Sequence, residues 1–288
     1  MFRGENLQCL IEGLVNIFNH IGGGPYRIVF DNASSIVSKI AKNKDRTLTE
    51  GFMRFKNHYG FQAVFCNPAS GHEKGNVEKK VGYHRKNFFV PEPEFDSLIE
   101  FNKTLLQELD RDQNREHYRE NNTIKELFKE DLNALLALPA VEFEAANIIS
   151  KRTDANACTL YRGLHRYSTK PSLVKSRAHV KLTAHKVIIL DKDFREVVVH
   201  ERLYEKTKQE SFKWIPYLNQ ISKRPRALKY TGIYDLFPAR IKEYLDKLSH
   251  EKLKDILKTL NSLTQETNFD AAIDVLLDAI EHGANDRV

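Results

Sequence analysis

The residues best suited to chemistry lie between Pro68 and Lys86, where a loop rich in Pro, Ser and Gly leads into a predicted short helix. A single carboxylate, Glu78, falls in the first turn of that helix. The basic residues around it are Lys74, Lys79, Lys80, Arg85 and Lys86. A carboxylate can hold a divalent cation, and neighbouring bases can hold a phosphate backbone. The pattern predicts a metal-dependent site that acts on a polyanion.

A second acid, Asp31, directly follows a predicted strand at 27–30. The carboxyl ends of strands are where α/β sheets usually place their chemistry. The chain between Asp31 and Glu78 has room for a helix, a strand and a loop, so both acids can reach one sheet edge. Each acid also has a purely structural interpretation. Asp-Asn is a common turn signal, and a helix dipole favours Glu in a first turn.

Charge is spread unevenly along the 288 residues, whose formal net charge is +6. Acids exceed bases after Ile241, so the part before it is strongly basic. A basic body predicts nucleic-acid binding, and an acidic tail favours a protein partner. Three distant cysteines argue against a disulfide framework or a zinc ribbon. Without a signal-peptide pattern or an apolar run of about 20 residues, we expect a cytoplasmic, nucleoid-associated protein.

Hydrophobic periodicity predicts an α/β order for the first 92 residues. A helix at 5–20 precedes the strand at 27–30, and a helix at 47–58 precedes a strand at 61–65. The loop and the helix with Glu78 follow. Residues 93–140 are predicted as a helical extension, with a helix at 94–117 and a capping box from Thr123 to Glu126.

The hydrophobic pattern changes after Pro139 from helical periodicity to short alternating segments. Short alternating segments at 159–161, 165–168, 179–182, 186–190 and 196–200 predict a small β-barrel over 141–205. Residues 206–240 are predicted as a basic linker, in which Lys223, Arg224 and Arg226 are candidate DNA-binding residues. Residues 241–288 are predicted as an acidic tail, with helices near 238–248, 250–262 and 269–282.

Several motifs resemble the IstA transposases, which bacterial insertion sequences encode beside an ATPase helper. The motifs are Gly22-Gly23-Gly24-Pro25, Val29-Phe30-Asp31-Asn32, His58-Tyr59-Gly60-Phe61 and Gly71-His72-Glu73-Lys74-Gly75-Asn76-Val77-Glu78. A weaker likeness continues through Tyr161-Arg162-Gly163 and His165-Arg166-Tyr167-Ser168. The resemblance implies an α/β RNase H-like (integrase) core at 1–92, followed by the β-barrel and helices that meet partners.

The same resemblance implies a DDE triad that cleaves DNA and transfers strands with Mg²⁺ (or Mn²⁺). Asp31 matches the second acid and Glu78 the third. Glu73 is the rival for the last role, but the turn Gly75-Asn76-Val77 before Glu78 fits the integrase pattern better. The implied partners are transposon ends and target DNA, an AAA+ ATPase helper of the IstB type, and further copies of the chain on DNA.

One departure from the family pattern concerns the first acid, which should stand on a strand before Asp31. Residues 1–30 contain no Asp, and their acids, Glu5 and Glu12, fall on a predicted helix. We therefore expect an N-terminally truncated transposase with an incomplete core, inactive as this chain. The alternative is a non-catalytic remnant that binds DNA or a full-length transposase. A third hypothesis is a standalone metal nuclease, which would cut without joining.

Overall fold

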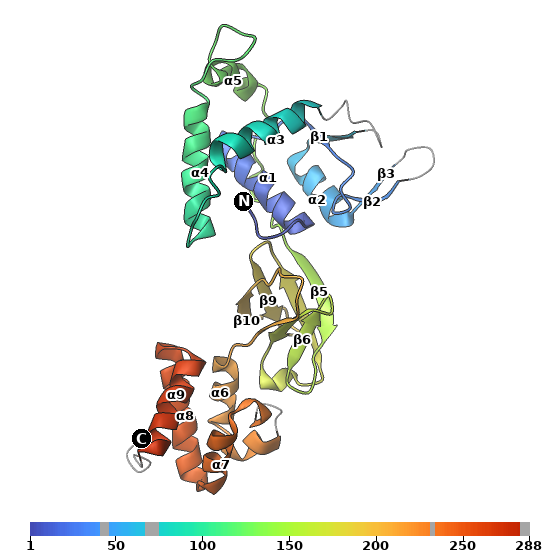
Figure 1. Cartoon of the computed structure of the whole chain (residues 1–288). Coiled ribbons are helices and arrows are strands. Elements are labelled where there is room, and N and C mark those ends of the chain that lie inside the picture. Colours follow the sequence, from blue (N-terminus) through green and yellow to red (C-terminus); the bar gives the residue numbers. More distant parts are fainter. Residues whose placement is uncertain (41–45, 67–74, 231–233, 283–288) are drawn as a thin grey trace. The chain divides into compact units, whose positions relative to one another are not determined.

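The structure is a computed structural model that describes residues 1–40, 46–66, 75–230 and 234–282. Its internal contacts divide the chain into two units, residues 1–145 (unit 1) and residues 146–288 (unit 2) (Figure 1). Each unit has a hydrophobic core of its own. No helix within the described ranges is long and apolar enough to span a membrane.

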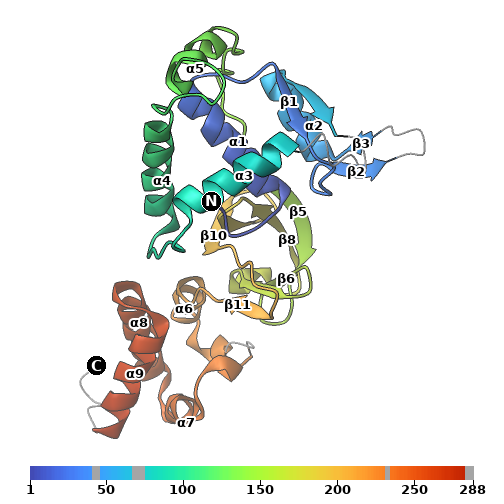
Figure 2. The same cartoon turned by 45° about the horizontal axis from the view of Figure 1, so that its top comes forward.

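Unit 1 is a mixed α/β unit, as the sequence predicts (Figure 2). The predicted strand at 27–30 is confirmed, whereas the helix predicted at 94–117 is shorter and the hairpin β2–β3 was not predicted. The elements in chain order are α1 (Leu7–Ile21), β1 (Arg27–Phe30), β2 (Val37–Ile40), β3 (Arg46–Leu48), α2 (Glu50–Tyr59), β4 (Gln62–Phe65), α3 (Gly75–Phe88), α4 (Leu98–Asp112) and α5 (Ile124–Asn133).

Helix α1 has a defined start and end. The side chain of Asn6 accepts a hydrogen bond from the backbone N–H of Cys9 at 3.1 Å, which satisfies one of the free donors of the first turn. Gly22 ends the helix in the left-handed conformation with φ of 76°, a geometry that glycine adopts without strain. The next turn pairs with a distant segment, because Gly24 and Leu136 exchange backbone hydrogen bonds of 2.9 and 2.7 Å.

The core of unit 1 is aromatic. Phe52 and Phe55 of α2 are fully buried and contact rings from α1, β1 and β4. Phe143 also packs on Phe55, with ring centroids 5.5 Å apart. The segment near residues 136–145 therefore completes a core that begins with α1.

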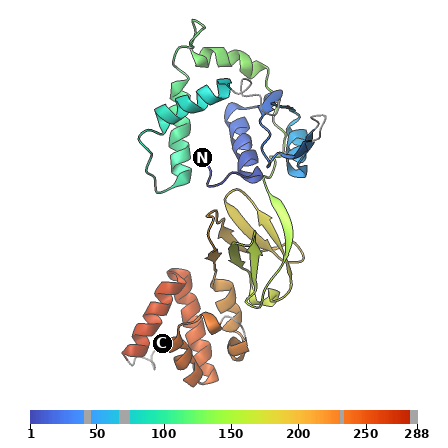
Figure 3. The same ribbon diagram turned by 45° about the vertical axis from the view of Figure 1, so that its right-hand side comes forward.

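Unit 2 contains two open sheets and a group of helices (Figure 3). One sheet has the order β10-β9-β8-β5, and the other has the order β11-β7-β6. The strands are β5 (Asn147–Arg152), β6 (Cys158–Tyr161), β7 (His165–Ser168), β8 (Arg177–Leu182), β9 (Lys186–Leu190), β10 (Glu196–Glu201) and β11 (Gln209–Ser211).

The predicted small β-barrel was wrong, since the described strands form two open sheets and no closed ring of backbone hydrogen bonds. Side chains connect the sheets instead. The ring of His200, on β10, lies 2.8 Å from the carbonyl of Ser168 on β7 and 2.9 Å from the hydroxyl of Ser211 on β11. The strands are only three to six residues long, which limits how far their backbone ladders extend.

The described α-helices of unit 2 are α6 (Ile215–Ile221), α7 (Ala239–Lys247), α8 (His250–Glu266) and α9 (Phe269–Glu281). The last three confirm the helices predicted near the C-terminus. The segment 206–240, predicted as a linker, instead supplies buried core residues such as Tyr217, Leu218 and Phe237. Their burial gives this basic segment a fixed place in unit 2.

Candidate active site

Asp31 lies at the carboxyl end of β1, and its side chain is exposed. Strands β1 and β4 are parallel, with Phe30 opposite Phe65. The chain therefore leaves both strands at the same edge of the sheet, at Asp31 from β1 and at Cys66 from β4. The Asn32 side-chain amide donates a 3.0 Å hydrogen bond to the carbonyl of Cys66, which joins the two strand ends.

Glu78 lies in the first turn of α3, and its side chain is also exposed. The chain reaches this helix after β4, and the first turn of α3 lies close to the β1–β4 sheet in Figures 1 and 2. Glu73 and Lys74, the other candidates here, lie outside the described residues.

The middle of helix α3 is hydrogen-bonded to the last residue of α4. The hydroxyl of Tyr83 donates a 2.6 Å hydrogen bond to Asp112, and Arg115 donates a 3.1 Å hydrogen bond to the same carboxylate. The hydrogen bond to Asp112 is the main cause of the raised pKa of Tyr83. Burial acts to raise the pKa of Asp112, but the hydrogen bonds from Tyr83 and Arg115 lower it overall. The ionised carboxylate is thus favoured, and it fixes the helix that carries Glu78.

The predicted basic residues of α3 are Lys79, Lys80, Arg85 and Lys86, and all four are exposed. The ammonium group of Lys80 lies 5.8 Å from the centre of the Tyr83 ring, a cation–π contact that leaves the charge at the surface. Val81 is 44% exposed, because α3 has only a weak apolar face. At helical spacing Arg85 shares a face with Glu78, whereas Lys79, Lys80 and Lys86 fan out over the other exposed faces of the helix.

The other predicted DNA-binding residues, Lys223, Arg224 and Arg226, lie exposed in unit 2, after α6. None of them forms an ion pair with any residue that the structure describes, whereas the nearby Lys229 pairs with Asp246 at 2.7 Å. The predicted basic residues thus fall on two units, and each group is a separate candidate surface.

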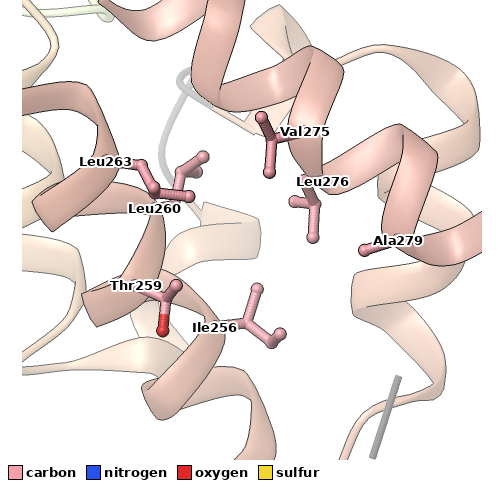
Figure 4. A pocket seen from close by; sticks show the side chains of 7 residues that line it. All are labelled: Ile256, Thr259, Leu260, Leu263, Val275, Leu276 and Ala279. Carbon is pink, nitrogen blue, oxygen red and sulfur yellow. The ribbon is translucent and has the colours of Figure 1, made fainter. Parts of the chain in front are cut away.

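Within the described ranges, no group of three or more His, Cys, Asp and Glu side chains is arranged to hold a metal ion. Asp31 and Glu78 are nevertheless exposed carboxylates, and carboxylate oxygens are the ligands that Mg²⁺ prefers. An apolar cavity between α8 and α9 offers no alternative site (Figure 4), because none of its seven lining side chains titrates. The two candidate acids, Asp31 and Glu78, are thus exposed side chains of unit 1.

Sequence reasoning missed Asn32 and Arg46, which contact the strand ends beside Asp31. Arg46 donates a 2.7 Å hydrogen bond to the side-chain oxygen of Asn32 and another of 2.7 Å to the carbonyl of Cys66. The Asp-Asn dipeptide was noticed as a turn signal and as part of a family motif, but not as a hydrogen-bonding partner of another segment. Nothing in the local pattern around Arg46 indicates these partners, because they become neighbours only when β3 folds back.

No family model matches the chain. It is 30% identical over 251 residues to a transposase of Aminobacter aminovorans, an alignment that covers 83% of this chain and 48% of the relative. It is 28% identical over 247 residues to the transposase for insertion sequences IS1326/IS1353 of Pseudomonas aeruginosa, covering 82% of this chain and 47% of the relative. It is also 30% identical over 143 residues to the transposase for insertion sequence element IS21 of Pseudomonas aeruginosa, covering 49% of this chain and 36% of the relative.

The chain spans about half the length of the first two of these curated relatives. The similarity extends through both units, since each of these two alignments covers more than four fifths of the chain. Two of these homologues are named transposases for insertion sequences and the third is named a transposase, so they support a transposase as the type of protein to which this chain is related.

Proposed function

We propose that this chain takes part in DNA cleavage and strand transfer during transposition of an insertion sequence, with Asp31 and Glu78 as metal-binding acids of an RNase H-like site. The observation that carries the proposal is the parallel, in-register pairing of β1 and β4. Through this pairing, Asp31 and the chain that leads to the helix of Glu78 leave the sheet at one edge.

The acidic and basic residues of the proposed site would have different roles. Asp31 and Glu78 would hold Mg²⁺ or Mn²⁺, which when bound polarises a phosphodiester and stabilises the charge that develops on it. Lys79, Lys80, Arg85 and Lys86 would bind phosphates of the DNA on either side. The hydrogen bond from Tyr83 to Asp112 would hold α3, with Glu78 and these cations, against α4.

More specifically, we propose that the chain belongs to an IstA-type transposase with a DDE triad. Its substrates would be transposon ends and target DNA, and its partners an IstB-type AAA+ ATPase and further copies of itself. We assign the role of the first acid to neither Glu5 nor Glu12. Glu5 precedes α1 and Glu12 lies on it, so neither stands on a strand beside Asp31.

The test is cleavage and strand transfer by the purified chain on labelled duplex DNA that carries transposon ends, with Mg²⁺ or Mn²⁺. The missing first acid predicts an inactive chain, whereas we propose metal-dependent nicking. This nicking should be lost by at least two orders of magnitude in Asp31→Asn and in Glu78→Gln, as expected when charge stabilisation at a reacting centre is removed. The matched control is Glu92→Gln, which removes an exposed acid beyond α3 and should retain full activity.

Binding of the same DNA separates the proposal from the alternative. Salt-sensitive binding with no metal-dependent nicking would overturn the catalytic proposal and favour a non-catalytic DNA-binding remnant. Nicking without joining would favour a metal nuclease. In the binding assay, Lys79→Ala and Lys80→Ala should each remove one cation from the phosphate backbone and so reduce the slope of log K against log salt by about 1.

A further inference from the structure

Arg46, the first residue of β3, joins the ends of two strands that belong to the proposed site. Its Nε donates to the Asn32 side-chain oxygen at 2.7 Å, and its Nη2 donates to the Cys66 carbonyl at 2.7 Å. The Asn32 amide donates to that same carbonyl at 3.0 Å. These three hydrogen bonds form a closed triangle across the carboxyl ends of β1 and β4, which we call the strand-end clamp.

The clamp rests on the hydrophobic core. The Arg46 guanidinium lies 5.5 Å from the centre of the Phe65 ring, and Phe65 in turn contacts Phe30 and Phe52. Arg46 is only partly exposed. A planar guanidinium with donors in a fixed fork can bind two acceptors and lie over a ring at once, which a lysine ammonium cannot reproduce.

The clamp acts on the backbone on both sides of the proposed site. Asp31 stands between Phe30, which is buried in the core, and Asn32, which the clamp holds. Cys66 is the last described residue before the segment that leads to α3. The backbone at Asp31 is thus fixed from both sides, while its carboxylate remains exposed.

We propose that Arg46 is a positioning residue, which holds Asp31 in register with the strand that leads to Glu78. This inference rests on the proposed function, because it gives Arg46 its purpose. Metal-binding acids must be held within about 0.5 Å of their productive geometry, and residues that support them do so through hydrogen bonds and packing. In this role Arg46 does not bind the metal or the DNA itself. It positions Asp31 through its hydrogen bonds to Asn32 and Cys66.

The first test measures the clamp without any activity assay. Cys66 is 7% exposed, so its thiol should react with iodoacetamide only when this strand end opens. Mass spectrometry of the labelled peptides follows Cys66 separately, with the buried Cys9 and Cys158 as internal references. We expect Arg46→Met to raise the labelling rate of Cys66 about tenfold while the other two rates stay unchanged, since two charge-assisted hydrogen bonds are lost.

Two further variants sharpen this readout. Arg46→Lys keeps the charge but not the fork, so its labelling rate should lie between those of wild type and Arg46→Met. Arg54→Met removes an exposed cation from α2 and should leave the rate at the wild-type value. An unchanged Cys66 rate in Arg46→Met, or a general rise at all three cysteines, would overturn the clamp.

The second test measures Mn²⁺ affinity by titration calorimetry of the full chain. Arg46→Met should weaken binding by about three- to tenfold and Arg46→Lys by less, as for other groups that orient metal ligands. A faster Cys66 rate with wild-type Mn²⁺ affinity would overturn the positioning role. If Asp31→Asn has the same Mn²⁺ affinity as wild type, the proposed function fails, whereas the clamp is still decided by the Cys66 rate.

Discussion

The two units place their polar groups in opposite ways. Unit 1 has a core of packed rings, with Phe18, Phe52 and Phe55 almost fully buried, and its candidate acids and bases lie exposed at the ends of elements. Unit 2 buries polar side chains among apolar ones. His200 and Tyr217 are fully buried, and the Tyr217 hydroxyl contacts the backbone of Asn156, Ala157 and Thr169.

The difference separates polar groups that support the fold from polar groups that can meet a ligand. A buried polar atom must find its partner inside the protein, because leaving it unpaired costs about 1–3 kcal/mol. Burial raises the pKa of Tyr217, and its hydrogen bonds hold β-strand ends to α6. An exposed carboxylate such as Asp31 can be hydrated by water, so it needs no partner inside the protein and remains accessible to a cation.

The largest expected effect tests the aromatic core of unit 1. Phe52→Ala removes a fully buried ring that contacts Phe30, Phe55, Phe61 and Phe65. It should lower the free energy of unfolding by about 3–5 kcal/mol, because apolar burial is lost and a cavity is left behind. Urea unfolding followed by circular dichroism measures the loss.

The control for this prediction is the neighbouring residue on the same helix. Met53 is 46% exposed, so Met53→Ala should change the free energy of unfolding by no more than about 0.5 kcal/mol. A Phe52→Ala variant as stable as Met53→Ala would mean that the rings of unit 1 are not its core.

The second effect tests the buried polar contacts of unit 2 through pH. Because a carbonyl only accepts, Nε2 of His200 carries the proton that it donates to Ser168, and Nδ1 accepts from Ser211. Burial lowers the pKa of His200 from 6.5 to about 4. The unfolded chain then binds a proton that the folded chain does not, between about pH 6.5 and pH 4. Stability of unit 2 should fall by about 3 kcal/mol as the pH falls through this range.

The single tryptophan reports on this unit. Trp214 stacks on Phe269 with ring centroids 3.6 Å apart, so its fluorescence should change when the helical core of unit 2 opens. His200→Gln should flatten the pH dependence, whereas His282→Gln, at the exposed end of α9, should leave it as in wild type. A steep dependence that persists in His200→Gln would assign it to other groups.

Sequence patterns predicted the elements whose signals are local. The strands at 165–168 and 186–190 have the predicted bounds, and the capping box at Thr123 forms as expected. The patterns failed where distant segments meet. Strand β5 was not predicted, because it has no fully buried side chain and its alternation is faint. The small β-barrel was inferred from short alternating segments and the family resemblance, neither of which shows whether these strands close into a ring.

The third effect tests how the segment near 136 closes unit 1. A methyl group at Gly23 would come within 2.7 Å of Leu135 Cβ and 2.9 Å of the Leu136 carbonyl. Gly23→Ala should therefore destabilise the protein by about 1–3 kcal/mol through overpacking. Gly82 of α3 has open space around it, so Gly82→Ala should instead stabilise the protein by up to about 1 kcal/mol through helix propensity. Thermal unfolding of the pair measures both signs, and a loss in both variants would contradict the steric argument.

The candidate site could be predicted only in part, for the same reason. Asp31 and Glu78 were recognisable because an acid after a strand and an acid at a helix start are local signals, and their catalytic roles remain predictions. Arg46 carried no signal, since its hydrogen-bond partners Asn32 and Cys66 lie on two other segments. Long-range contacts of this kind follow from the folded backbone and not from periodicity.

The smallest expected effect completes the comparison with an exposed polar contact of unit 1. Thr123 and Glu126 form a reciprocal capping box at the start of α5, with backbone hydrogen bonds of 2.9 and 3.2 Å. These bonds are exposed, so water replaces them easily, and Thr123→Ala should cost only about 1 kcal/mol. The hydrogen bonds to Thr123 lower the pKa of Glu126, so the box should also weaken as that carboxylate becomes protonated at acid pH.

Hydrogen exchange of the α5 amides should rise about fivefold in Thr123→Ala and stay unchanged in Thr104→Ala, an exposed threonine within α4. A cost for Thr123→Ala as large as the effect at His200 would remove the distinction between exposed and buried polar contacts.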